Sequence, residues 1–118
     1  MSKFNNPHYL LPLIFGLSAF TVYVSSTTAA EKLTVDLVLS VEADRDYGEY
    51  LAGECMTCHN GQDTNIPVIK GKERVYIVDA LIEYKDLTRS NETMRSIAGS
   101  MGKDEIAALA AYYSDLSE

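Results

Sequence analysis

The residues with the clearest chemical potential lie together near the middle of the chain, in the run Cys55-Met56-Thr57-Cys58-His59. This is a C-x-x-C-H sequence, a pattern typical of covalent c-type haem attachment. Two thiols three residues apart on one helical turn can bond the two vinyl groups of one porphyrin. The imidazole of the next residue then points at the iron. The motif therefore predicts the anchoring of a single haem and its first axial ligand.

Two other chemistries use closely spaced cysteines. A thioredoxin-like redox pair requires a strand-helix-strand setting, which the sequence around Cys55 does not show. A structural zinc site needs four ligands. Beyond residue 30 the usual nitrogen and sulfur donors are only Cys55, Cys58 and His59. Haem attachment is therefore the interpretation that these residues favour.

A haem iron bound by His59 has one more axial position, and beyond residue 30 the chain contains no second His. Methionine is then the natural sixth ligand, because a Met/His pair raises the reduction potential and suits electron transfer. Three methionines remain: Met56 inside the attachment turn, and Met94 and Met101 further along. Met94 and Met101 share one helical face, so spacing leaves the choice between them open, and methionine is also a common packing residue.

The elements that must position these residues are mostly helical. A helix with Asp44 as its N-cap and Asn60-Gly61 at its end places the two cysteines and His59 on one face. A loop that contains Pro67 follows over residues 62–71. Apolar residues at helical spacing predict three further helices, over 73–85, over 94–101 and from Gly102 onward.

The stretch from Glu31 to Val41 has a different pattern, because apolar and polar residues alternate along it. Val38 breaks this alternation. The pattern predicts a short extended segment. We expect it to pack on the helical domain or to add a strand to a partner, since exposed strands pair readily.

The first 30 residues have the composition of a secretory signal peptide. Lys3 gives a weakly positive start, Tyr9 to Val24 is apolar, and small residues from Ser25 to Ala30 suit a signal peptidase. Cleavage is predicted after Ala30. The alternative is an uncleaved membrane anchor, but the apolar run of 16 residues is shorter than the ~20 that cross a bilayer as a helix.

The charge of the chain limits its partners. Removal of residues 1–30 takes away one Lys and no acidic residue, so the remaining 88 residues have a formal charge of −8. Such a surface lacks the basic patch that binds nucleic acid, and it favours redox partners with a basic docking face. A chain of this size buries a modest core, which a covalently bound apolar cofactor would enlarge.

The order of helix, C-x-x-C-H, proline loop, helix, methionine segment and closing helix resembles the class I c-type cytochromes. The resemblance extends from about Asp44 to Leu116. The segments RSNETMRSIA (89–98) and EIAALAAYY (105–113) are similar to the bacterial monohaem members, notably the cytochrome subunits of flavocytochrome c sulfide dehydrogenases.

This resemblance implies a small all-α fold wrapped around one covalent haem. The corresponding domains are a signal peptide (1–30), a short extended N-terminal segment (31–43) and a cytochrome c domain (44–118). It also implies axial ligation by Met94, while Met101 falls where the family has a large apolar core residue. Pro67 matches the proline whose carbonyl accepts a hydrogen bond from the iron-binding His.

Several other residues fit the family pattern. Gly48 and Leu51 match the contact of the first helix with the last helix, near Leu109 and Tyr113. Tyr76, Tyr84 and Arg89 also fit, without an assigned role. The loop between His59 and Pro67 departs from the pattern because it lacks a glycine-rich run, which implies that one haem edge is more open.

These features lead to three hypotheses about function. The first is a freestanding periplasmic one-electron carrier with His/Met ligation. The second is a haem subunit that accepts electrons from a flavoprotein dehydrogenase, such as one that oxidises sulfide. The third is a gas-binding haem sensor whose methionine is displaced. With both axial positions filled there is no open site for a substrate, so the chain itself is not expected to be a catalyst.

Overall fold

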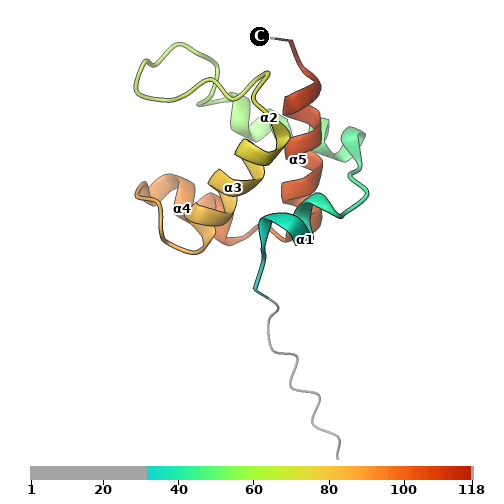
Figure 1. Ribbon diagram of the computed structural model, residues 1–118. Coiled ribbons are helices and arrows are strands. Elements are labelled where there is room, and N and C mark those ends of the chain that lie inside the picture. The colour runs from blue at the N-terminus through green and yellow to red at the C-terminus, as the bar shows by residue number, and fades with distance from the viewer. Residues whose placement is uncertain (1–31, 118) are drawn as a thin grey trace, which may run out of the picture.

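The computed structural model describes residues 32–117, and within this range it contains five helices and no strand (Figure 1). The expected all-α fold is therefore confirmed. The proposed signal peptide and its cleavage point after Ala30 lie outside the described residues. None of the helices in this part of the chain is both long enough and apolar enough to cross a membrane.

Helix α2 (Arg45–Met56) begins as expected, because the Asp44 side chain accepts a hydrogen bond from the backbone N–H of Tyr47 at 3.0 Å. Its expected end was wrong. The α-helix stops at Met56 rather than at Asn60-Gly61, and the chain continues in a turn. Gly61 does adopt the left-handed conformation, with φ +82°, but it serves the loop that follows the turn.

Helix α5 (Lys103–Asp115) packs along α2 and forms the centre of the domain (Figure 1). It begins where the Gly102 N–H donates to the Glu105 side chain at 3.0 Å, as the sequence predicts. Gly48 of α2 faces Ala108 and Tyr112 of α5, one residue before each of the expected partners. The core contains six buried residues of α5: Ile106, Ala107, Ala108, Leu109, Ala110 and Tyr113.

Helix α3 (Arg74–Lys85) packs against α5 and supports α4 (Glu92–Gly99). The predicted helix over 73–85 is confirmed within one residue. Helix α4 begins two residues earlier than expected and ends before Met101. The reason is a cap at its start, where the Asn91 side chain accepts a hydrogen bond from the Met94 N–H at 3.0 Å.

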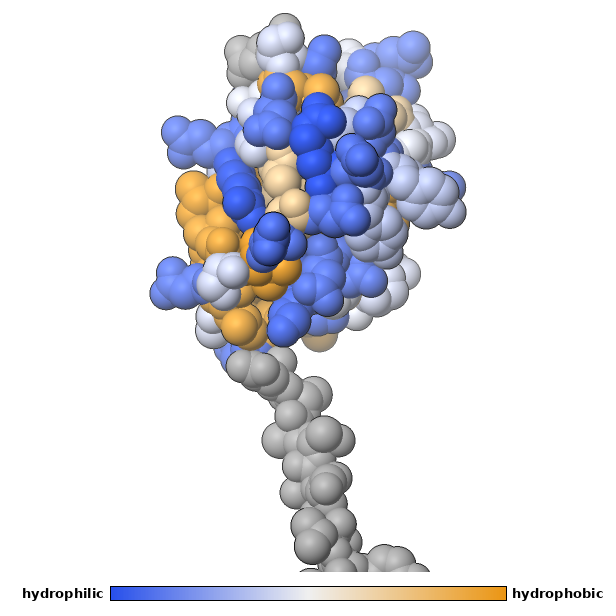
Figure 2. All heavy atoms as spheres, turned by 90° about the vertical axis from the view of Figure 1, so that its right-hand side faces the viewer, coloured by the Kyte–Doolittle hydropathy of each residue, from blue (hydrophilic) through white to orange (hydrophobic). Residues whose placement is uncertain are grey.

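The expectation of an extended segment from Glu31 to Val41 was wrong, because Val35–Leu39 forms a short helix, α1. Thr34 caps it by accepting a hydrogen bond from the Leu37 N–H at 3.2 Å. Val38, which broke the strand-like alternation, is 0% exposed and packs in the core against α3 and α5. Figure 2 shows apolar atoms gathered beside the beginning of the described chain, where α1 lies in Figure 1.

Candidate functional site

A cavity of about 340 Å³ lies between the C-terminal end of α2, the loop after it, and helices α3, α4 and α5. All five residues expected at the haem site line it: Cys55, Cys58, His59, Pro67 and Met94. Its apolar walls include Ile66, Ile69, Ile77, Leu81, Ile97 and Leu109. The fold thus brings two thiols, an imidazole and a thioether from separate parts of the chain to one largely apolar space.

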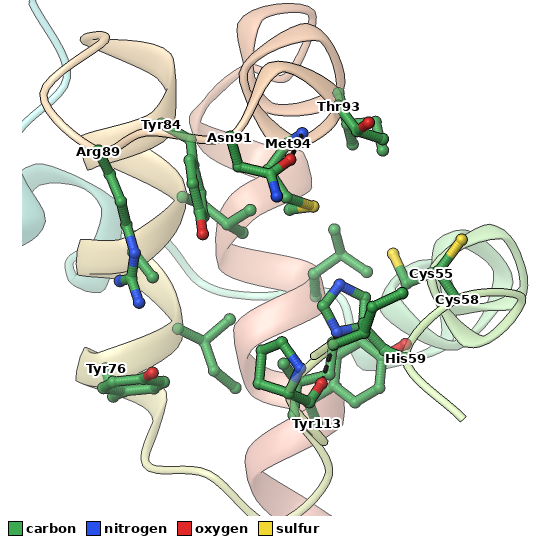
Figure 3. A pocket seen from close by; sticks show the side chains of 18 of the residues that line it. Cys55, Cys58, His59, Tyr76, Tyr84, Arg89, Asn91, Thr93, Met94 and Tyr113 are labelled. Carbon is green, nitrogen blue, oxygen red and sulfur yellow. Dashed lines mark hydrogen bonds between the residues drawn. The ribbon is translucent and has the colours of Figure 1, made fainter. Parts of the chain in front are cut away.

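The turn after α2 holds the two cysteines and the histidine. The N–H groups of Cys58 and His59 donate to the Cys55 carbonyl at 3.2 and 2.9 Å, which closes a tight turn. Cys55 is partly buried, Cys58 is exposed, and both are free thiols. Figure 3 shows their sulfur atoms on the same side of the turn. Burial raises the pKa of the Cys55 thiol, so the thiol is protonated at neutral pH.

His59 is oriented by the loop. Its Nδ1 lies 2.6 Å from the Pro67 carbonyl oxygen. A carbonyl oxygen can only accept, so Nδ1 is the protonated nitrogen and the lone pair of Nε2 is available for a metal. The loop itself is held at its far end, where the Gly71 N–H donates to the Tyr113 carbonyl at 2.9 Å. Loop and α5 together fix the direction of the imidazole.

Two of the three candidate methionines line the cavity. Met94 on α4 and Met101 after it are both partly buried and both border the space, whereas Met56 is 38% exposed and does not line it. Figure 3 shows the Met94 sulfur directed into the cavity, toward the side on which the His59 ring lies. The lining of the cavity therefore does not choose between Met94 and Met101. The cap at the start of α4 fixes the backbone of Met94.

A cationic and aromatic group lies on the α3 side of the cavity, opposite the cysteines (Figure 3). The Arg89 guanidinium sits 5.1 Å from the centre of the Tyr84 ring and 3.2 Å from the Glu83 carboxylate. A hydrogen bond to the Tyr76 hydroxyl is the main cause that raises the pKa of Arg89. A guanidinium, which stays ionised and is paired with one carboxylate, therefore lies at this wall of the cavity.

Tyr113 joins the cavity to α2. Its hydroxyl donates to the Ala52 carbonyl at 3.2 Å, and its ring meets the Tyr112 ring edge-on at 5.4 Å. Burial raises its pKa, with the neighbouring Cys55 as a further cause. The family resemblance placed Tyr113 near the contact of the first helix with the last, but gave no sign that it borders the candidate site.

Sequence reasoning also missed Asn91, which lines the cavity and caps α4. An Asn three residues before Met94 was the available signal, because Asn is a favoured N-cap. Among residues 32–117, no group of three or more His, Cys, Asp or Glu side chains is placed to hold a metal ion. The donors at the cavity are instead one imidazole and two thioethers beside two thiols, which fits a haem iron with covalent anchors.

Comparison with known proteins gives two relatives. No family model matches the chain. The chain is 39% identical over 75 residues to the cytochrome subunit of sulfide dehydrogenase of Chlorobaculum tepidum, an alignment that covers 60% of this chain and 67% of the relative. It is 36% identical over 75 residues to cytochrome c4 of Thiocapsa roseopersicina, covering 59% of this chain but only 38% of the longer relative.

Proposed function

The chain belongs to the c-type cytochromes, and we propose that it is a periplasmic one-electron carrier with a single covalently attached haem. Cys55 and Cys58 would form the thioether bonds, and His59 and Met94 would be the axial ligands. One observation supports this most directly: these four residues and Pro67 meet at one apolar cavity, with the His59 Nδ1 hydrogen-bonded to the Pro67 carbonyl.

The two iron ligands would have different roles. A haem held in the cavity would supply an iron that gains and loses one electron. The bond from His59 to Pro67 fixes the tautomer and makes Nε2 a stronger ligand. A thioether ligand on the other side raises the reduction potential. With His59 and Met94 both bound to it, the haem would have no position free for a substrate, and the chain would only transfer electrons.

The walls of the cavity also have a role. Apolar side chains from α3, α4 and α5 exclude water from the site, which stabilises the less charged ferrous state. Arg89, supported by Tyr76, lies opposite the cysteines. Since the carboxylates of a haem lie on the edge away from its vinyl groups, we propose that Arg89 binds a propionate through charge-assisted hydrogen bonds.

The first test is the visible spectrum of the protein produced with a cytochrome c maturation system. We expect a sharp reduced c-type spectrum, and haem that stays with the chain after denaturation. Replacement of Cys55 and Cys58 by Ala should abolish that retention. A colourless wild-type protein from a working maturation system would mean that the two cysteines form a redox or metal pair instead.

The choice of methionine has its own test. Met94→Ala should remove the weak red absorption band of Met-to-iron ligation, lower the potential and let carbon monoxide bind the reduced protein. Met101→Ala should keep the band and mainly cost packing, about 2 kcal/mol of unfolding free energy, since Met101 is only partly buried. The opposite pattern would assign the ligand to Met101.

A second candidate function is that of a haem subunit that accepts electrons from a flavoprotein dehydrogenase. It is favoured by one relative, which is named as the cytochrome subunit of a sulfide dehydrogenase. Flavin absorbance that co-purifies with the haem of the native protein would support it. A monomer without flavin would support the freestanding carrier.

The charge of the chain supports a partner with a basic docking face. Acidic side chains are exposed on α2 at Asp46, Glu49 and Glu54, beside Tyr50, which is 79% exposed. Electrostatic steering of such a partner predicts electron-transfer rates that fall steeply as salt is added. Rates that do not depend on salt would contradict a charged docking face.

Export is the remaining part of the proposal. Residues 1–30 would act as a signal peptide that is cut after Ala30. N-terminal sequencing of the mature haem protein should then begin at Glu31. A sequence that begins at Met1 or Ser2 would instead indicate an uncleaved anchor.

A further inference from the structure

Among the described helices, α4, which bears Met94, is the one that does not pack against the central helix α5. Among the described helices it makes close backbone contacts with α3 alone, whereas α2, α3 and α1 all pack against α5. Figure 1 shows α4 at the margin of the domain, joined to α3 by the connection over residues 86–91. The interactions that tie α4 to the end of α3 therefore decide where Met94 lies.

The Arg95 guanidinium forms the main tie at the start of α4. Its Nε donates to the Arg89 carbonyl at 2.8 Å and its Nη2 donates to the Leu87 carbonyl at 3.0 Å. A planar guanidinium is suited to two such bonds at once. One side chain, next in sequence to Met94, thus binds two backbone groups of the connection.

The connection needs such support because of its backbone. Leu87 has a φ of +62°, a left-handed conformation that is unfavourable for a residue with a Cβ. The N–H groups of Thr88 and Arg89 both donate to the Glu83 carbonyl, at 2.9 and 3.2 Å. The carbonyl groups of the same stretch are bound from the other side by Arg95.

The end of α4 has a second tie. The Lys85 ammonium donates to the Gly99 carbonyl at 2.8 Å, where a cation also interacts favourably with the C-terminal end of the helix dipole. Lys85 holds one end of α4 to α3, and Arg95 holds the other end. The Arg95 tie is the one that adjoins Met94 and includes the backbone of Arg89.

We propose that Arg95 is a positioning residue that keeps Met94 on the iron and Arg89 at the cavity wall by binding the carbonyl groups of Leu87 and Arg89. This inference rests on the proposed function, because it assumes a haem in the cavity. Loss of the two bonds frees the strained connection. Helix α4 then moves away from the site more often, and Met94 leaves the iron more often.

The test uses the reduced haem protein and carbon monoxide, which binds only when Met94 has left the iron. In Arg95→Met, which keeps an unbranched apolar stem but has no donors, we expect carbon monoxide to bind at least about tenfold faster, as the loss of a charge-assisted hydrogen bond would give. Arg95→Lys can donate to one carbonyl group at a time and should give a smaller increase. The red Met-to-iron band should weaken in the same order.

Arg45→Met is the matched control. It removes the same charge from the same residue type, but the contacts of Arg45 are with Asp115 at 3.2 Å and the Tyr112 ring at 5.4 Å, both on α5. Its carbon monoxide binding should equal that of the wild type. If Arg95→Met and Arg45→Met accelerate carbon monoxide binding equally, the cause is a general effect of the lost charge, and the inference is overturned.

If carbon monoxide binds Arg95→Met at the wild-type rate, the inference is also overturned, even if the variant unfolds more easily. If Arg95→Met yields no haem protein, Arg95→Lys alone decides: an accelerated rate supports the positioning role, and a wild-type rate overturns it. A wild-type protein without haem would overturn the proposed function and this inference with it. A wild-type protein with haem whose Arg95 variants are unchanged would overturn only the inference.

Discussion

Gly48 controls how closely α2 can approach α5. A Cβ at this position would lie 2.7 Å from the carbonyl carbon of Ala108, nearer still to its oxygen, and 3.0 Å from the Tyr112 Cβ. Ordinary contacts begin near 3.4 Å, so Gly48→Ala would force the two helices apart by roughly 1 Å. The two nearest obstructing atoms belong to the backbone of α5 and cannot turn away as the end of a flexible side chain could.

The magnitude follows from two opposing contributions. Overpacking of a well-filled contact costs about 1–3 kcal/mol. Alanine in a helix interior is favoured over glycine by about 0.5–1 kcal/mol. We therefore expect Gly48→Ala to lose a net 1–2 kcal/mol, roughly, or about 4–16 °C in melting temperature for a domain of this size.

Gly53 of the same helix is the matched control, because a Cβ there meets nothing within 4 Å. Gly53→Ala should gain about 0.5–1 kcal/mol from helix propensity alone. Urea unfolding of both haem-loaded variants, followed by far-ultraviolet circular dichroism, measures the difference. Equal stability of the two variants would refute the close contact between α2 and α5.

Three further predictions concern other parts of the domain. Burial raises the pKa of Tyr113 above its ordinary value of 10.0, so the stability that its protonated form contributes is complete below about pH 10 and is lost as the pH rises further. Tyr113→Phe should flatten that alkaline decline in urea unfolding and cost about 1 kcal/mol at neutral pH through the lost bond to Ala52, whereas Tyr50→Phe should leave the profile unchanged. Leu87→Gly should raise the free energy of unfolding by up to about 1 kcal/mol, and the melting temperature with it, because the Leu87 backbone is left-handed and the residue is 63% exposed. Val38→Ala should cost about 2 kcal/mol in urea unfolding, since Val38 is fully buried, and an unchanged midpoint would mean that α1 does not belong to the core.

The residues of the candidate site could be predicted from sequence because their chemistry is local. C-x-x-C-H occupies one turn, and His59, as the single His beyond residue 30, left no choice of first ligand. The four longer helices were predictable because each has an apolar face that packs against another helix. The end of α2 was predicted too late because Asn60-Gly61 was taken as a helix cap, while the chain had already left the helix at Met56.

The error at α1 has a physical cause. In five residues, the first and last positions of an alternating pattern are also four apart, so Val35 and Leu39 fit a strand and a helix equally well. Val38 joins them on the inner side of one helical turn. Val38 was the residue that distinguished the two patterns. The tertiary core decided between them, since it offered a site for Val38 that an extended segment could not fill.

The contacts that hold the cavity-lining residues in place could not be predicted from sequence. The Arg95 side chain donates hydrogen bonds to the backbone carbonyl groups of Leu87 and Arg89. Every residue has such a carbonyl group, so the residue types at these positions do not indicate which groups are bound. Tyr113 reaches Ala52 across 61 positions of sequence. Such contacts depend on how the helices dock, which periodicity along the chain does not record.

The burial of Cys55 by α5 also bears on whether haem attachment or folding comes first. Tyr113, which interacts with this thiol, belongs to the last helix and follows Ala52 by 61 positions. A chain made from its N-terminus exposes both cysteines long before α5 exists to bury one of them. Burial raises the pKa of the Cys55 thiol and makes it less reactive, so under the proposed function we expect haem to be attached to the exported chain before it folds. Under the proposed function, folding would then close α5 over a bond that had already formed, so haem attachment would precede the native state.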